Sequence, residues 1–207
     1  MLHSQNGPVP CHRSLEPVFI VLLVCTGNIC RSALAERLGR AYLGELLGDR
    51  AAGIRLASAG TQAVVGSGMH PDSALVLQGL GGDAGDFRAR QLVERMAVDA
   101  DLTLTMTRGH RQEVLSLAPR ALSRTFTLRE AADLIGMVEP DAELAGNGLT
   151  ERARALVGAM NEARARRQGG AADDVPDPIR CPPEFHLEVG EAVAASLLPV
   201  LARLAAV

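Results

Sequence analysis

The stretch VLLVCTGNICRSALAERL, residues 21–38, passes from aliphatic residues through a cysteine and a glycine to a charged, helix-like pattern. Residues 18–24 form a short aliphatic run that is half β-branched, which predicts a buried strand. From Leu34 to Leu46 an apolar residue recurs at every fourth position, which predicts one face of a helix. The stretch therefore predicts a strand, a tight loop and a helix in immediate succession.

The same alternation continues along the rest of the chain. Further strands are predicted at 54–60, 100–106 and 123–128. Further helices are predicted from Pro71, over 108–117, from about Arg129, over 150–168 with Thr150 as N-cap, and over a last segment with Val189, Val193, Leu197, Leu201 and Leu204 on one stripe. Alternating strands and helices indicate an α/β fold with a mostly parallel sheet covered on both faces, and ligands bind outside the carboxyl ends of its strands.

The length of 207 residues is typical of one domain with extensions. Residues 1–16 lack periodicity and contain two prolines, so we expect a flexible N-terminal leader there. Residues 17–207 are then a single domain, with an insertion expected near 136–149.

Composition narrows the classes of partner and compartment. The net charge of -3 supplies no basic face for nucleic acid, so no nucleic-acid partner is expected. The four cysteines show no disulfide framework, which favours a reducing cytoplasm. Residues 18–24 are too short for a secretory signal core, and no stretch approaches the length of a membrane span, so no membrane partner is expected.

The loop CTGNICR, residues 25–31, has the features of a phosphate cradle at the start of a helix. Gly27 suits a curled loop that needs positive φ, Asn28 tolerates the left-handed conformation, and Arg31 offers a planar fork to two phosphate oxygens. The residues expected to bind phosphate are Thr26, Gly27, Asn28, Ile29, Cys30 and Arg31.

Cys25 lies at the bottom of this predicted anion hole, whose field would stabilise a thiolate. The arrangement fits attack on phosphorus to give a cysteinyl phosphate that water hydrolyses. Ser32, at the helix start, can donate its hydroxyl to the sulfur. Such chemistry requires no metal, and we expect no cofactor.

The segment CTGNICRS closely resembles the signature of the low-molecular-weight protein tyrosine phosphatases. The resemblance continues through SAGT at 58–61, RARQL at 88–92, ADLTLTMT at 100–107 and VPDP at 175–178. It implies a compact three-layer domain with a four-stranded parallel sheet flanked by helices. It also implies that Asp177 is the general acid, and that Ser58, the family's serine near the loop, hydrogen-bonds Asn28.

A positioned acid is what a basic alkoxide or phenolate leaving group needs. The prolines at 176 and 178 restrict the loop around Asp177, and Asp174 is its nearest competitor for the role. For Cys30 two interpretations remain open: the resemblance suggests a disulfide with Cys25 that shields the nucleophile, whereas a free cysteine is commonly a core residue.

The predicted activity is hydrolysis of a phosphomonoester, on a phosphorylated protein, foremost at phosphotyrosine, or on a small substrate. The substrate wall lacks aromatic residues, because Ile179 and Arg180 follow the Asp-Pro element and TQAVVGSGMH follows the second strand. A phosphoarginine phosphatase is an alternative, although the resemblance places threonine where this chain has Ile29. Arsenate reduction is set aside because no cysteine lies between Arg31 and Cys181. A phosphate-binding or redox-sensing module with little turnover is the alternative outside the enzymes.

Overall fold

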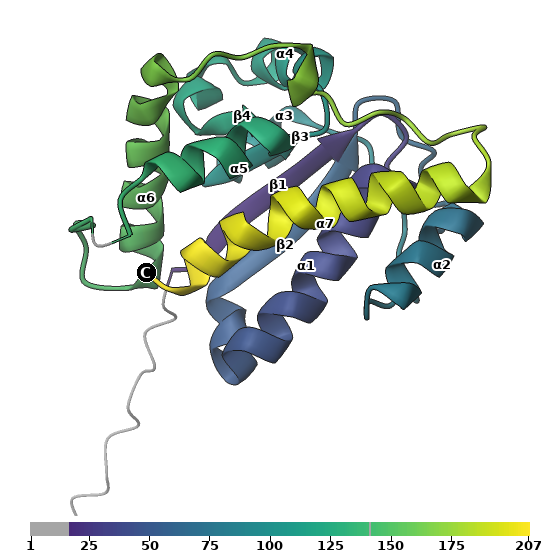
Figure 1. The fold of residues 1–207 in the computed structure, drawn as a ribbon, viewed down its shortest axis with the longest axis horizontal. Coiled ribbons are helices and arrows are strands. Elements are labelled where there is room, and N and C mark those ends of the chain that lie inside the picture. Colours follow the sequence, from purple (N-terminus) through teal and green to yellow (C-terminus); the bar gives the residue numbers. More distant parts are fainter. Residues whose placement is uncertain (1–16, 141) are drawn as a thin grey trace, which may run out of the picture.

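A computed structural model describes residues 17–140 and 142–207 of the chain, so the predicted leader lies outside the described residues. Its centre is a parallel sheet of four strands in the order β2-β1-β3-β4 (Figure 1). The strands are β1 (Phe19–Cys25), β2 (Ile54–Gly60), β3 (Leu102–Thr105) and β4 (Thr125–Thr127). The predicted α/β fold with a four-stranded parallel sheet is confirmed.

Seven α-helices accompany the sheet within the described residues. They are α1 (Arg31–Leu47), α2 (Pro71–Gly79), α3 (Glu94–Asp99), α4 (Arg108–Leu117), α5 (Leu128–Met137), α6 (Leu149–Ala163) and α7 (Pro183–Ala205). Helix α3 was not predicted, because six residues are too few to show a helical period. The segment between α5 and α6 covers much of the expected insertion, which stays a prediction.

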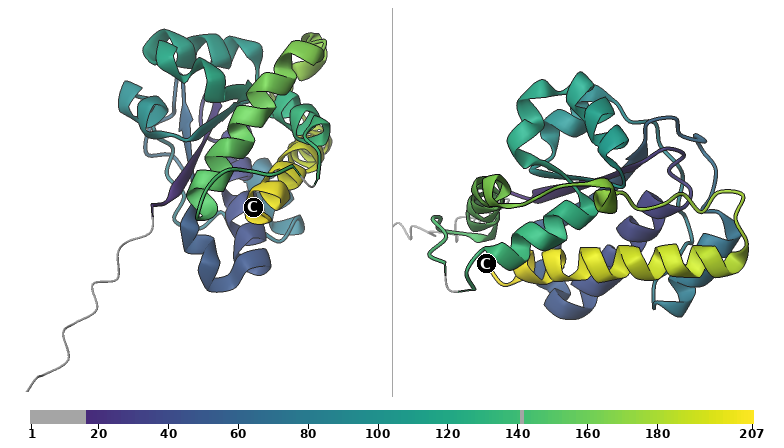
Figure 2. Two further views of the ribbon diagram at one scale, coloured as in Figure 1. Left: turned by 90° about the vertical axis from the view of Figure 1, so that its left-hand side faces the viewer. Right: turned by 45° about the horizontal axis from the view of Figure 1, so that its top comes forward.

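The helices cover both faces of the sheet (Figure 2). Side chains alternate between the faces of a strand, so Phe19, Val21 and Leu23 of β1 join the larger core under α1, α5 and α7. Leu22 and Val24 point the other way, into a smaller core with α3 and α4. This alternation leaves the carboxyl end of β1 between the two helical layers.

Helix α6 differs from its prediction in its bounds and in its cap. Helix α6 begins at Leu149 with Gly148 as its N-cap, and it ends at Ala163 instead of 168. Thr150 lies inside the helix and donates its hydroxyl to the carbonyl of Pro17, so a long-range contact takes the place of the expected cap.

On α1 the buried leucines are Leu34, Leu38, Leu43 and Leu47, whereas Leu46 is 49% exposed. A helix turns every 3.6 residues, so a spacing of four drifts off the buried face by the third turn. The buried stripe therefore follows the helical period rather than the strict spacing of four.

Helix α7 is long and apolar enough to cross a membrane by length and composition, contrary to our reading of the sequence. Its predicted stripe, Val189, Val193, Leu197, Leu201 and Leu204, is buried within the larger core, and the helix crosses α1 and α5 (Figure 1). A core helix passes the same composition test, so this finding is weak evidence for a span.

Candidate active site

The loop between β1 and α1 is held by the segment that follows β2. The carbonyls of Cys25, Thr26, Gly27 and Ile29 accept hydrogen bonds from N–H groups within residues 61–70, at 2.8–3.0 Å. In a planar trans peptide the N–H points opposite to the C=O. Carbonyls held outward therefore leave the N–H groups of the loop on its inner side, as an anion cradle requires.

Asn28 is the left-handed residue of this loop, with φ of 54°. Gly27 does not have the positive φ that we expected of it, because the turn falls one residue later. The buried Asn28 side chain donates to Ser32 Oγ at 2.9 Å and to Ser58 Oγ at 2.8 Å, and its Oδ1 accepts from the N–H of Arg90 at 2.8 Å. These three bonds brace the loop from below, and the hydrogen bond expected between Ser58 and Asn28 is present.

The Cys25 sulfur lies at the base of the loop and the residue is 2% exposed. Ser32 Oγ is 2.9 Å away, and the N–H of Asn28 donates to the sulfur at 3.3 Å. The two expected partners, loop and Ser32, are therefore within reach of Cys25.

Arg31 reaches from the first turn of α1 across the loop. Its Nη2 lies 2.6 Å from Asp177 Oδ2, and its Nη1 donates to the carbonyl of Val175 at 3.0 Å. Its Nε is buried and has no hydrogen-bond partner within the described residues. A buried donor without a partner suits an incoming oxyanion.

Asp177 is held over the loop by its own turn, because the N–H of Ile179 donates to Asp177 Oδ1 at 3.2 Å. Asp174, the competitor, instead accepts from the N–H of Arg108 at 2.8 Å and pairs with its guanidinium. Of the two carboxylates, Asp177 lines the pocket that contains Cys25.

His110 is a site residue that the sequence interpretation missed. Its Nε2 lies 2.8 Å from Thr26 Oγ1, and its Nδ1 lies 2.9 Å from Oγ1 of Thr107, the N-cap of α4. Burial, and then the charge of Arg31, lower the pKa of His110 to about 4, so the ring is neutral at pH 7. Its place just after the carboxyl end of a predicted strand was the available signal.

Glu36 was also missed. Its buried carboxylate accepts from Ser58 Oγ at 2.5 Å and from Arg90 Nη2 at 3.1 Å, and Arg40 pairs with its other oxygen. Because Ser58 and Arg90 both bond Asn28, Glu36 supports the loop from a second layer. A glutamate at a helical position carries no sequence signal for such a role.

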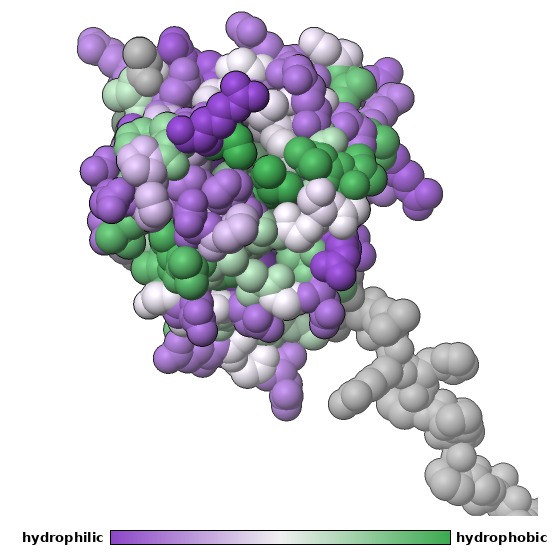
Figure 3. All heavy atoms as spheres, turned by 90° about the vertical axis from the view of Figure 1, so that its right-hand side faces the viewer, coloured by the Kyte–Doolittle hydropathy of each residue, from purple (hydrophilic) through white to green (hydrophobic). Residues whose placement is uncertain are grey.

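The pocket above the loop has a volume of about 160 Å³. Its lining residues are Cys25, Thr26, Gly27, Ile29, Cys30, Arg31, Val64, Asp177 and Ile179. Val64 and Ile179 are 48% and 39% exposed. On the face of the molecule toward which β1 points, apolar residues gather among polar ones (Figures 1 and 3). Larger hollows of about 350 and 450 Å³ lie away from Cys25, beside Arg55 and Arg154.

Comparison with known proteins identifies the family of this chain. The family model for low molecular weight phosphotyrosine protein phosphatase matches residues 20–143. A protein of Erwinia amylovora, named "Probable low molecular weight protein-tyrosine-phosphatase AmsI", is 36% identical over 106 residues, which cover 51% of this chain and 68% of that protein.

Solved structures are also similar. The low molecular weight protein tyrosine phosphatase from T. tengcongensis has a TM-score of 0.62 and 27% identity, with coverage of 89% of this chain and 97% of that chain. The YwlE arginine phosphatase from Geobacillus stearothermophilus has a TM-score of 0.60 and 26% identity, with coverage of 91% of both chains. This chain therefore belongs to the low molecular weight phosphotyrosine protein phosphatase family and is a hydrolase of that type.

Proposed function

We propose that the chain hydrolyses phosphomonoesters on tyrosine side chains of proteins, through a cysteinyl-phosphate intermediate on Cys25. The single observation that carries this proposal is the convergence on one pocket of the Cys25 sulfur, the Arg31 guanidinium and the Asp177 carboxylate. A nucleophile, an oxyanion receptor and a proton donor are together what the reaction needs.

In the first step the phosphate enters the loop. Its oxygens accept hydrogen bonds from the inner N–H groups and from the free Nε of Arg31. The incoming charge competes with Asp177 for the guanidinium and favours the protonated form of the carboxyl group. The Cys25 thiolate then forms the S–P bond while the P–O bond to the leaving group breaks. Asp177 gives its proton to the leaving oxygen.

In the second step water attacks the phosphorus of the cysteinyl phosphate. Asp177, now a carboxylate, takes the proton of that water, and the S–P bond breaks. Ser32, 2.9 Å from the sulfur, stabilises the departing thiolate by donating its hydroxyl. Inorganic phosphate leaves, and the enzyme returns to its starting protonation state without a metal or a cofactor taking part.

The pocket wall favours an aryl ester as substrate. Val64 and Ile179 line the pocket together with Ile29, so an aromatic ring would meet aliphatic side chains. Aliphatic contacts bury the ring, but they lack the additional binding free energy of an aromatic pair, about 1 kcal/mol for each pair. We therefore expect phosphotyrosine to be accepted with modest affinity.

Phosphoarginine is the second candidate, supported by the similarity to the YwlE arginine phosphatase. Against it, the Ile29 side chain lines the pocket and cannot accept a hydrogen bond from a guanidinium.

We also propose a cytoplasmic location. The free state of Cys25, Cys30 and Cys181 supports this location, because thiols stay reduced in the cytoplasm.

The test is phosphate release from peptides of one sequence that carry phosphotyrosine, phosphoserine or phosphoarginine. We expect turnover of the phosphotyrosine peptide, slow or no turnover of the others, and complete loss in Cys25→Ser. Preference for phosphoarginine would transfer the proposal to that substrate. Phosphate binding without turnover of any peptide would overturn it in favour of a binding module.

A further inference from the structure

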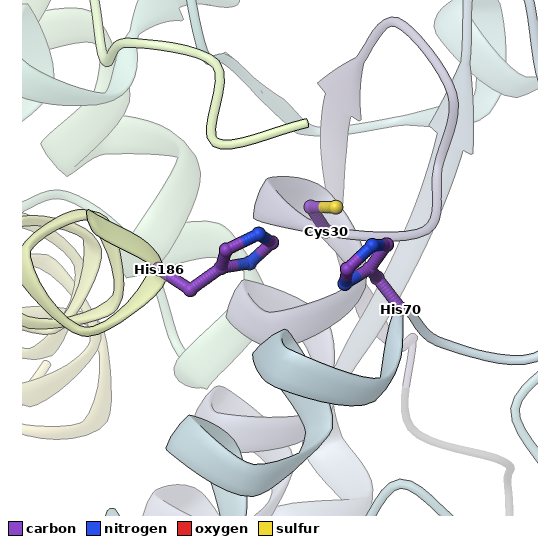
Figure 4. Close-up of side chains that lie close together, drawn as sticks. All are labelled: Cys30, His70 and His186. Carbon is purple, nitrogen blue, oxygen red and sulfur yellow. The ribbon is translucent and has the colours of Figure 1, made fainter. Parts of the chain in front are cut away.

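A second group of reactive side chains lies beside the anion loop, and the reaction does not use it (Figure 4). Cys30 ends the loop, His70 is the N-cap of α2, and His186 lies in the first turn of α7. One ligand atom from each lies within 4.8 Å of the corresponding atoms of the other two. The fold thus brings three distant segments to one point.

The imidazoles of this Cys30–His70–His186 cluster have unfilled hydrogen-bonding capacity. His186 is 1% exposed, and its Nε2 has no hydrogen-bond partner within the described residues. The same holds for the buried Nδ1 of His70. Buried polar atoms are nearly always paired in proteins, so unpaired nitrogens on two histidines that lie beside a thiol point to a ligand.

The groups around the cluster match those that support metal ligands. His186 Nδ1 lies 2.9 Å from Ser73 Oγ, and such a bond to the second nitrogen fixes the orientation of a ligating imidazole. Asp72 Oδ2 lies 3.8 Å from His70 Nδ1 and 4.0 Å from His186 Nε2. A small movement of this partly exposed carboxylate would bring it to a metal held by the two rings.

We propose that Cys30, His70 and His186 bind a zinc-type divalent cation, with Asp72 as the fourth ligand. One thiolate, two imidazoles and a carboxylate form a donor set that suits zinc in tetrahedral coordination. The bonds formed are those of the metal to Sγ, the two ring nitrogens and a carboxylate oxygen. The Cys30 S–H proton is released to solvent, and no electron is transferred.

The two imidazoles of the cluster pack against each other. Their rings are stacked, with centroids 4.7 Å apart and an interplanar angle of 17°.

The position of the site gives it a structural consequence. Cys30 directly precedes Arg31, and α7 follows the loop that carries Asp177. A cation bound at the cluster would tie the anion loop, α2 and the start of α7 together. It would also occupy the Cys30 sulfur and prevent a disulfide with Cys25.

The experiment uses the full chain with Cys25→Ser, so that the nucleophile cannot compete for the metal. Isothermal titration with ZnCl2 should give one site per chain, and Co2+ should give tetrahedral visible bands with a thiolate-to-cobalt charge-transfer band. Zinc should raise the melting temperature. Because binding is read without turnover, the outcome is independent of the proposed reaction.

On this background Cys30→Ser should abolish the charge-transfer band, and His70→Asn should weaken zinc at least 100-fold. Asp72→Asn should weaken it roughly 10-fold. His70 is partly exposed, so its variant keeps the test valid if the buried His186→Gln fails to fold. The control Cys181→Ser removes a free cysteine outside the cluster and should leave binding unchanged. Unaltered zinc affinity in Cys30→Ser and His70→Asn, or cobalt bands without a thiolate component, would overturn the proposal.

Discussion

Asp177 is bound to Arg31, with 2.6 Å between Oδ2 and Nη2. Its side chain is 40% exposed, so solvent screens the pair and it contributes little to stability. The contact instead places the carboxylate at the mouth of the pocket. Phosphate binding would release it at the point where a leaving group needs a proton.

Asp177→Ala should slow turnover by about 10²–10⁴-fold for basic leaving groups and much less for acidic ones, because only a basic oxygen needs a proton in the transition state. A series of substituted phenyl phosphates, with kcat plotted against leaving-group basicity, measures this dependence. Asp174→Ala is the matched control and should leave the slope unchanged, since Asp174 is occupied by Arg108. An equal loss for all leaving groups would remove Asp177 from the acid role.

His110 makes stability depend on pH in one direction. Its pKa is lowered to about 4 in the folded chain, against an ordinary value of about 6.5. Between these values the unfolded chain binds more protons, so the free energy of unfolding falls as pH drops from about 6.5 to about 4.

Urea unfolding at pH 7 and pH 4.5 should show this loss, on the order of 2 kcal/mol after allowance for solvent screening. In His110→Gln the difference between the two pH values should be smaller by that amount, because the group that titrates is gone. An unchanged difference in the variant would show that other groups cause the pH dependence.

At the level of elements, the end of β2 forms the floor under the anion loop. Cys25 is paired with Gly60 across the parallel strands. A Cβ on Gly60 would lie 2.3 Å from the carbonyl oxygen of Thr26, which is backbone and cannot move aside. The loop and the end of β2 therefore approach as closely as two main chains allow.

Gly60→Ala should destabilise the fold by about 3 kcal/mol and lower kcat/KM, because the added methyl group displaces the Thr26 peptide. Gly158→Ala is the control: Gly158 is an exposed position of α6 with open space around it, and alanine should stabilise the helix by about 1 kcal/mol. Unfolding curves and kinetics of both variants check these values. Full activity in Gly60→Ala would contradict the close approach.

At the level of the whole molecule, α7 connects the site to the main core. It begins a few residues after Asp177 and crosses α1 and α5 (Figure 1). Leu197 is fully buried near Gly39 of α1, where a Cβ would meet its Cδ2 at 3.5 Å. At Gly39, therefore, α1 packs closely against α7, and α1 is the helix that carries Arg31.

Leu197→Ala should lower the free energy of unfolding by about 3 kcal/mol through the lost burial and the cavity it leaves. Leu187→Ala, on the same helix but at a 47% exposed position, should change it by less than about 0.5 kcal/mol. Chemical denaturation with kcat measured on the folded fraction separates stability from catalysis. A similar cost for both variants would show that α7 does not contribute to the core as described.

Local patterns in the sequence were enough to predict the strand, loop and helix around Cys25. They were also enough to predict β2 and α4 together with their bounds. Aliphatic runs, helical spacing and a glycine-containing turn are properties of neighbouring residues. The loop residues could be selected for the same reason, because their motif is contiguous, whereas the role of Asp177 was implied by the family resemblance.

Other features depended on residues far apart in the chain. Thr26 meets His110 across 84 positions, and Ser73 meets His186 across 113. The sequence by itself determined the α/β alternation and the composition of the anion loop, through interactions that act within a turn or a strand. Only the tertiary structure decided that His110 and Glu36 support this loop and that two histidines face Cys30, because these contacts exist only after the sheet and α7 have brought distant segments together.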